Sequence, residues 1–62
     1  MLEETILHDC RRTQKMINIY LVNGYKLYGS VSAFDEKCIE FVDENGYRKL
    51  LYKHAISTIE FH

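Results

Sequence analysis

The chain carries one stretch that decides its fold, Ile17-Asn18-Ile19-Tyr20-Leu21-Val22-Asn23-Gly24. Apolar residues at every second position predict a strand with one face on a core. Asn-Gly directly after such a run is a strong signal for a β-hairpin. We therefore expect a tight turn here, of type I′, with positive φ angles at both central residues.

The same pattern continues on the C-terminal side of this turn. We expect further strands at residues 25–34, 37–42, 47–52 and 55–61, with a second Asn-Gly hairpin tip in Asp43-Glu44-Asn45-Gly46. Gly29 lies inside the second strand, where a glycine marks a bulge or a sharp bend. The sequence thus predicts a five-stranded, strongly bent antiparallel sheet, a partly open small barrel.

On the N-terminal side, residues 2–14 predict a helix. Leu2, Ile6, Cys10 and Thr13 lie roughly on one stripe. Arg11 and Arg12 come near the end of this helix, where positive charge complements the helix dipole. The fold class is then mainly β with one N-terminal α-helix, and residues 1–62 form a single domain.

Sixty-two residues leave a small core, which such chains supplement with disulfides, a metal or self-association. Cys10 and Cys38 could form at most one bridge, and we interpret them as free, buried, small apolar residues. The histidines and cysteines lack metal-site spacing, so we expect neither a metal nor a cofactor. No apolar run could span a membrane and the N-terminus lacks signal-peptide features, so we expect a cytoplasmic protein without a membrane partner.

Self-association is the remaining way to bury surface. A short terminal strand leaves backbone groups unpaired at a sheet edge, and the edge of a second copy can satisfy them. Head-to-tail pairing of this kind generates a ring if the rotation between copies closes, and we expect such a ring. The net charge of −1 excludes a strongly basic nucleic-acid binder, so any anion must be bound by local clusters.

Two motifs resemble one known family. They are Ile19-Tyr20-Leu21-Val22-Asn23-Gly24 with Lys26-Leu27-x-Gly29, and Tyr52-Lys53-His54-Ala55-Ile56-Ser57-Thr58, with Phe34-Asp35 between them. In this order they closely resemble bacterial Hfq, the RNA-chaperone branch of the Sm/Lsm family, from about residue 7 to residue 59. The resemblance implies an Sm-like fold and a homohexameric ring. It also implies binding of single-stranded RNA on two faces and a rim, and pairing of small regulatory RNAs with messenger RNAs.

For the distal face, the resemblance implies a site for adenine-rich RNA. Its residues are Tyr20, Asn23, Gly24, Tyr25, Lys26, Leu27, Lys49, Ser57 and Thr58. Tyr25 beside the Gly24 turn has the character of a stacking platform for a base. Lys49 occupies the position of a glutamine that reads adenine in some relatives. The alternative interpretation is that Tyr20 and Leu27 are ordinary strand residues.

For the proximal face and pore, the resemblance implies a uridine site formed by Glu36, Lys37, Lys53 and His54. Lysine offers phosphate a point charge, and histidine can donate to uracil or phosphate oxygens. Lys37 replaces an aromatic residue that stacks on uridine, and Glu3 replaces a glutamine. We therefore expect weaker binding of uridine tracts than is usual in the family. The alternative is an exposed, solvated Lys-His pair.

For the rim, the resemblance implies a basic patch of His8, Arg11, Arg12 and Lys15. His8 replaces an asparagine and Gln14 a basic residue, so we expect weak RNA-annealing activity. The arginines could equally serve only the helix dipole. We expect structural roles for Gly29 and for Asp35, whose carboxylate accepts backbone hydrogen bonds at a turn.

Two other functions remain to be compared. The first is a divergent Sm-like paralogue with weakened ring assembly or RNA binding, which acts as an interaction module. Lys37, Glu3, Gln14 and the negative net charge favour it. The second is a small enzyme, which we do not expect, because nothing orients a base beside Ser57 and His54 and no glycine-rich phosphate loop exists.

Overall fold

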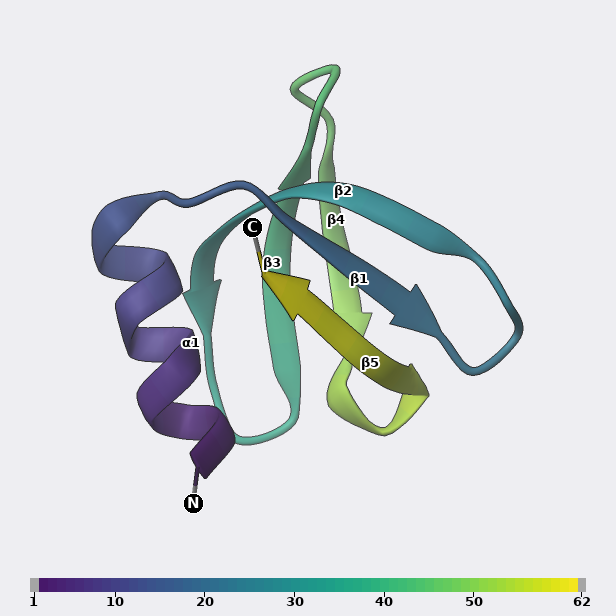
Figure 1. Cartoon of the computed structure of the whole chain (residues 1–62), viewed down its shortest axis with the longest axis horizontal. Coiled ribbons are helices and arrows are strands. Elements are labelled where there is room, and N and C mark those ends of the chain that lie inside the picture. Colours follow the sequence, from purple (N-terminus) through teal and green to yellow (C-terminus); the bar gives the residue numbers. More distant parts are fainter. Residues whose placement is uncertain (1, 62) are drawn as a thin grey trace.

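The computed structural model describes residues 2–61, with side chains from residue 5 onward. Helix α1 (Leu2–Thr13) comes first and the strands follow (Figure 1). They are β1 (Ile17–Leu21), β2 (Lys26–Phe34), β3 (Cys38–Asp43), β4 (Arg48–Tyr52) and β5 (Ile56–Phe61). The predicted N-terminal helix and five strands are confirmed. A short 3-10 turn, Lys53–Ala55, joins β4 to β5 and was not predicted.

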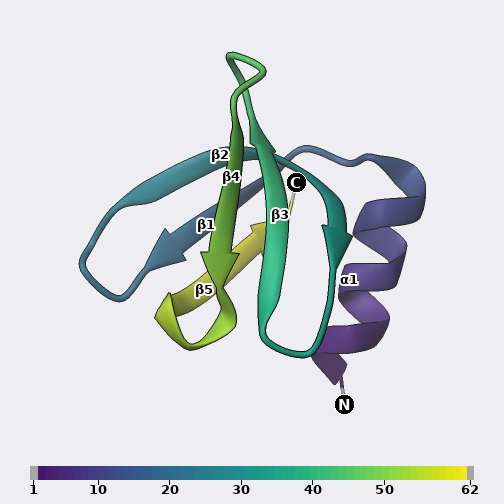
Figure 2. The same ribbon diagram turned by 180° about the vertical axis from the view of Figure 1, so that it is seen from behind.

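The five strands form one antiparallel sheet with the order β4-β3-β2-β1-β5. Within the described residues, β4 and β5 therefore pair on one side only and form the two edges of the sheet. Helix α1 lies beside the C-terminal half of β2, as the views from both sides show (Figures 1 and 2). The β1–β2 and β3–β4 hairpins project away from the helix.

The core lies between α1 and the concave side of the sheet. It consists of Leu7, Cys10, Ile17, Ile19, Val31, Ile39, Phe41 and Leu51. The alternation predicted for β1 is confirmed, because Ile17 and Ile19 are completely buried. The predicted helix stripe is wrong in one respect: Thr13 is exposed, and Leu7 with Cys10 forms the buried face. The Leu2 side chain lies outside the described residues.

Both hairpin turns differ from the predicted type I′. Gly24 has a φ of 96° and Gly46 a φ of 87°, whereas neither preceding asparagine has a positive φ. The Leu21 N–H donates to the Tyr25 carbonyl over 2.8 Å, and the Gly24 N–H donates to the Leu21 carbonyl over 3.0 Å. The β3–β4 turn repeats this pattern. Each loop therefore has three residues, a type I turn closed by a glycine in the left-handed region.

Strand β2 bends where it changes partner. Its residues 26–29 pair with β1 and its residues 29–34 with β3, so Gly29 belongs to both ladders. The bulge lies further along, because Val31 pairs with Phe41 and Ala33 with Glu40. Ser32 is thus the extra residue of the bulged strand. The expected bend therefore falls at Gly29, and the bulge falls at another residue.

Helix α1 ends at a strained residue, which gives a first prediction. Gln14 has a φ of 56°, and its N–H donates to the Cys10 carbonyl over 2.9 Å. The left-handed region costs an L-residue roughly 1–2 kcal/mol, and glycine is the usual residue at this cap. We expect Gln14→Gly to raise the free energy of unfolding by about 1 kcal/mol.

Urea denaturation at a fixed protein concentration measures this change. Thr13→Gly is the matched control, because Thr13 is the last residue of α1. A glycine there should lower the free energy of unfolding by roughly 0.5–1 kcal/mol. Equal destabilisation by both substitutions would show that the cap is not strained.

Candidate nucleic-acid interface

One polar surface covers the side of the sheet that faces away from the core. We call it the outer face; it belongs to β2, β1 and β5 and carries Lys26, Tyr28, Asn18, Tyr20, Thr58 and Glu60. Tyr20 lies at its centre, because it pairs with Lys26 on β2 and with Thr58 on β5. The Lys26 Nζ lies 5.8 Å from the centroid of the Tyr20 ring. The outer face therefore has an aromatic ring with a cation beside it at its centre.

The β1–β2 turn lies at one end of the outer face and positions three predicted residues. The Asn23 Oδ1 accepts the Tyr25 N–H over 3.1 Å, an Asx turn that fixes the loop. Gly24 is required only for its φ, since an added Cβ would meet no atom within 4 Å. The Tyr25 side chain is 69% exposed. Its ring is therefore available to a base.

Three other residues predicted for the distal face lie elsewhere. Leu27 pairs with Ile19 and packs against the core. Ser57 is the extra residue of a bulge in β5, and its hydroxyl lies 3.4 Å from that of Thr58. Lys49 is on β4, at the opposite edge of the sheet from β5. Sheet pairing within one chain does not bring Lys49 to Tyr20.

The predicted proximal residues lie on two turns that contact each other. The Lys53 N–H donates to the Lys37 carbonyl over 2.8 Å, which joins the 3-10 turn to the β2–β3 turn. The Lys53 Nζ lies 5.6 Å from the centroid of the Phe34 ring. The His54 ring stacks on Tyr52, with 5.8 Å between centroids. Lys37, Lys53 and His54 thus come together.

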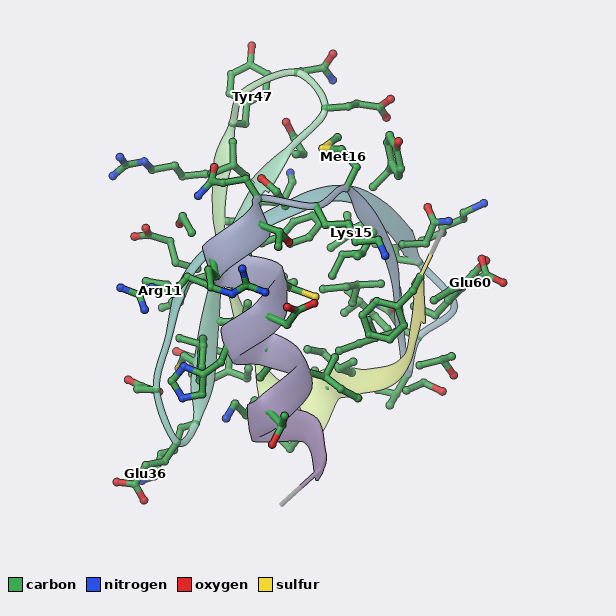
Figure 3. All side chains as sticks on the ribbon, turned by 60° about the vertical axis from the view of Figure 1, so that its left-hand side comes forward. Arg11, Lys15, Met16, Glu36, Tyr47 and Glu60 are labelled. Atoms are coloured by element: carbon green, nitrogen blue, oxygen red, sulfur yellow. The ribbon has the colours of Figure 1, made fainter. Side chains whose placement is uncertain are left out.

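Glu36 borders the same region. It lines a pocket of about 510 Å³ together with Lys53 and His54, and the apolar part of the lining comes from α1, β3 and β5. Figure 3 shows Glu36 and Glu60 on opposite sides of the molecule. Ser57 and Thr58, which were predicted for the distal face, also line this pocket, so the two predicted RNA faces adjoin at β5.

Asp35 holds the β2–β3 turn. Its Oδ1 accepts the N–H groups of Cys38 over 2.7 Å and of Lys37 over 2.8 Å. These two bonds, that of Cys38 first, lower the pKa of the Asp35 carboxyl. Because the pKa is lower in the folded chain, the carboxylate stabilises the fold at neutral pH. This contribution is lost as the pH falls through the folded pKa.

The rim is less basic than its sequence indicates. Arg12 forms an ion pair with Asp9 one helical turn before it, with an N–O distance of 2.5 Å. The Ser32 hydroxyl, which lines the same open pocket as Arg12, lies 2.7 Å from a Glu40 carboxylate oxygen. The Asp9 carboxylate lines this pocket together with both arginines. Among the residues with described side chains, Arg11 forms no ion pair.

The remaining rim residues are exposed. The His8 ring packs edge-on against Phe34, with 4.9 Å between centroids, and Lys15 follows the end of α1. Figure 3 shows Arg11 and Lys15 around the C-terminal part of this helix. Three of the four predicted rim residues, His8, Arg11 and Arg12, line one pocket.

The sequence prediction missed two acidic residues at these surfaces. Asp9 precedes Arg12 by three residues, the spacing of an ion pair on a helix. Glu60 follows Thr58 by two, the spacing that places both on one face of a strand. The Tyr20 hydroxyl donates to a Glu60 carboxylate oxygen over 3.1 Å. Both signals were present in the sequence.

The two cysteines differ in burial. Both are free thiols, and Cys10 is buried as predicted, whereas Cys38 is only partly buried, which corrects the prediction for that residue. Burial raises the pKa of the Cys10 thiol. Among the described residues, no three His, Cys, Asp or Glu side chains form a group that could hold a metal ion. None of the described helices is long and apolar enough to span a membrane.

One helix on an open, bent sheet with the order β4-β3-β2-β1-β5 defines an Sm-like fold. The family model described as "Hfq protein" matches residues 2–62. The chain is 47% identical over 58 residues to "RNA-binding protein Hfq" of Bradyrhizobium sp. (strain ORS 278), covering 94% of this chain and 70% of that protein. The same figures hold for a Nitrobacter winogradskyi protein of that name. The chain belongs to the Hfq family.

Solved structures agree with this assignment. A crystal structure titled as the pleiotropic translational regulator Hfq superposes with a TM-score of 0.92 at 25% identity, covering 97% of this chain and 98% of that one. A crystal structure of an Hfq protein from Anabaena sp. gives a TM-score of 0.87 at 21% identity, covering 98% and 97%. The fold and the sequence therefore point to the same family.

Proposed function

We propose that this protein is a ring-forming RNA chaperone of the Hfq type. It binds single-stranded, adenine-rich and uridine-rich RNA in the cytoplasm and promotes the pairing of small regulatory RNAs with messenger RNAs. One observation carries the proposal: Tyr20 lies between Lys26 and Thr58 on the outer face, with the exposed Tyr25 at the adjoining turn. Aromatic platforms beside cations bind unpaired bases.

The outer face is the proposed distal, adenine-rich site. Each exposed aromatic ring can stack one base, and Lys26 can neutralise the phosphate that follows it. The cation–π contact also holds the lysine beside the tyrosine ring instead of leaving it mobile. The family assignment supports this proposal, since the curated relatives are named as RNA-binding proteins.

The opposite surface is the proposed proximal, uridine-rich site. Lys53 and His54 supply a charge and a donor, and Lys37 lies beside them through its carbonyl. Lys37 can neutralise phosphate but cannot stack on a base. We therefore propose that uridine tracts bind here more weakly than adenine tracts bind the outer face.

Ring assembly follows from the two sheet edges. Strands β4 and β5 each leave one side of the backbone unpaired in the described chain, and antiparallel pairing between copies would satisfy both. Leu50 and Tyr52 on β4 are 61% and 53% exposed, so this edge strand carries two large apolar side chains that a second copy could cover. We propose a homohexamer, which gathers six copies of each weak RNA site.

A second function has its own support. The Arg12–Asp9 ion pair and the contact of Lys49 with Asp43, 3.4 Å from nitrogen to oxygen, engage two cations that would otherwise face RNA. A divergent Sm-like module with reduced RNA binding would show these features. Native mass spectrometry with and without an adenine-rich 18-mer separates the two functions: a ring that binds RNA supports the chaperone, and a monomer without bound RNA supports the module.

Tyr25→Ala should weaken the binding of an adenosine 18-mer about tenfold, since stacking contributes roughly 1–3 kcal/mol per base. Fluorescence anisotropy at moderate salt measures the affinity. Tyr47→Ala is the matched control: Tyr47 is also 69% exposed and also follows the glycine of a three-residue hairpin loop. It should leave the affinity unchanged. Equal affinities of the Tyr25 variant and the wild type would contradict a stacking role.

A further inference from the structure

The outer face has two rows of side chains across β2, β1 and β5. The first row is Lys26, Tyr20 and Thr58, and the second is Tyr28, Asn18 and Glu60. The first row contains the residues on which the proposed RNA site rests. The second row has been given no function so far. It ends in a carboxylate, an unexpected group on a surface proposed to bind a polyanion.

Glu60 is held in place by two hydrogen bonds to one of its oxygens. Its Oε1 accepts from the Asn18 Nδ2 over 3.3 Å and from the Tyr20 hydroxyl over 3.1 Å. Asn18 is only 5% exposed, so its amide is a fixed donor within the sheet. Both of these bonds are to Oε1, and Glu60 is an exposed residue, so its carboxylate keeps lone pairs that a ligand can reach.

Tyr20 has a positive group on one side and a negative group on the other. The Lys26 ammonium lies on the β2 side of the ring, and the Glu60 carboxylate meets the hydroxyl on the β5 side. A nucleotide on this surface would place its phosphate toward Lys26 and away from Glu60. Its base edge would then point toward Glu60.

We propose that Glu60 is a specificity-determining residue of the outer face, where its carboxylate accepts a hydrogen bond from the exocyclic amino group of a base. A carboxylate can only accept, so it favours the amino groups of adenine and cytosine. It repels the carbonyl oxygen that uracil or hypoxanthine presents at that position. This inference rests on the proposed RNA binding and names the class of base that the surface selects.

The test compares two 18-mers that differ in one chemical group. One is built of adenosine and the other of purine ribonucleoside, which lacks only the amino group. We expect the wild-type protein to bind the adenosine 18-mer about tenfold more tightly, and Glu60→Gln to reduce this ratio to about twofold. An amide can donate as well as accept, so the variant keeps the bonds to Tyr20 and Asn18 but loses the discrimination.

One control separates recognition from charge. Glu44→Gln removes an exposed carboxylate from the β3–β4 turn and should change both affinities equally.

An unchanged ratio in Glu60→Gln, or an equal gain for both 18-mers, would overturn the role of Glu60, because either result shows simple repulsion or none. If the wild type binds the adenosine 18-mer but prefers it by less than about twofold, the inference fails and the proposed function stands. If the wild type binds neither, the proposed function fails and this inference with it.

Discussion

Gly29→Ala is expected to lower the free energy of unfolding by about 3 kcal/mol or more, which is a third or more of the roughly 3–9 kcal/mol that a domain of this size has. An added Cβ would lie 2.1 Å from the Val42 carbonyl oxygen, 2.8 Å from the Asp43 Cα and 2.9 Å from the Phe41 ring. Two of these atoms are backbone and cannot rotate away. The clash could be relieved only by moving β3 away from β2, which would open the sheet at its bend.

The other two glycines supply the matched controls. An added Cβ at Gly24 or Gly46 would meet nothing within 4 Å, so only the positive φ opposes it. Alanine at either turn should cost roughly 1–2 kcal/mol. Urea denaturation followed by circular dichroism measures all three variants. If Gly29→Ala is no more destabilising than Gly24→Ala, the approach of β3 to β2 is looser than the structure shows.

The sequence predicts the elements of this fold because its patterns are local. Ile17 and Ile19 alternate with polar residues, and burial in the structure follows that alternation. The sequence does not reveal why residue 29 must be a glycine. The Val42 carbonyl oxygen on the neighbouring strand leaves no room there for a Cβ. The pattern indicates a bend, whereas the contact with β3 exists only after the strands have paired.

The turn type shows a similar limit. Asn-Gly suits a two-residue type I′ loop, and it also suits the last two residues of a type I loop that ends in a left-handed glycine. The choice depends on which residues close the hairpin. Here Leu21 bonds to Tyr25, so the loop has three residues. Strand register, which is a tertiary property, therefore decides what the dipeptide alone leaves open.

The candidate site was predictable where the family motifs contain its residues, and not where the hairpin register decides which charged side chain a lysine meets. The family motifs give Tyr20, Lys26 and Thr58, and sheet pairing places them side by side. Lys49 was predicted for the same surface, but it lies 3.4 Å from Asp43 across the β3–β4 hairpin. An ion pair between two strands depends on the hairpin register. The positions of lysines in the sequence therefore do not reveal which of them are free to bind RNA.

Leu50→Glu is expected to convert the proposed ring into monomers and to weaken RNA binding by about 100-fold or more. Leu50 is exposed on the edge strand β4, which we propose to pair with β5 of the next copy. A carboxylate buried there without a partner costs several kcal/mol, and a closed ring repeats that cost at every interface. The monomer should still fold, because the side chain is exposed within one chain.

Native mass spectrometry and anisotropy with the adenosine 18-mer measure the two effects separately. Tyr47→Glu is the matched control, since it adds the same charge at an exposed residue of the same hairpin, outside β4. It should keep the mass of the ring and most of the affinity. A Leu50→Glu protein of unchanged mass would show that β4 does not form the interface. A monomer with unchanged affinity would show that the outer face of a single chain binds RNA as tightly as the ring does. The affinity would then not depend on several copies of the site acting together.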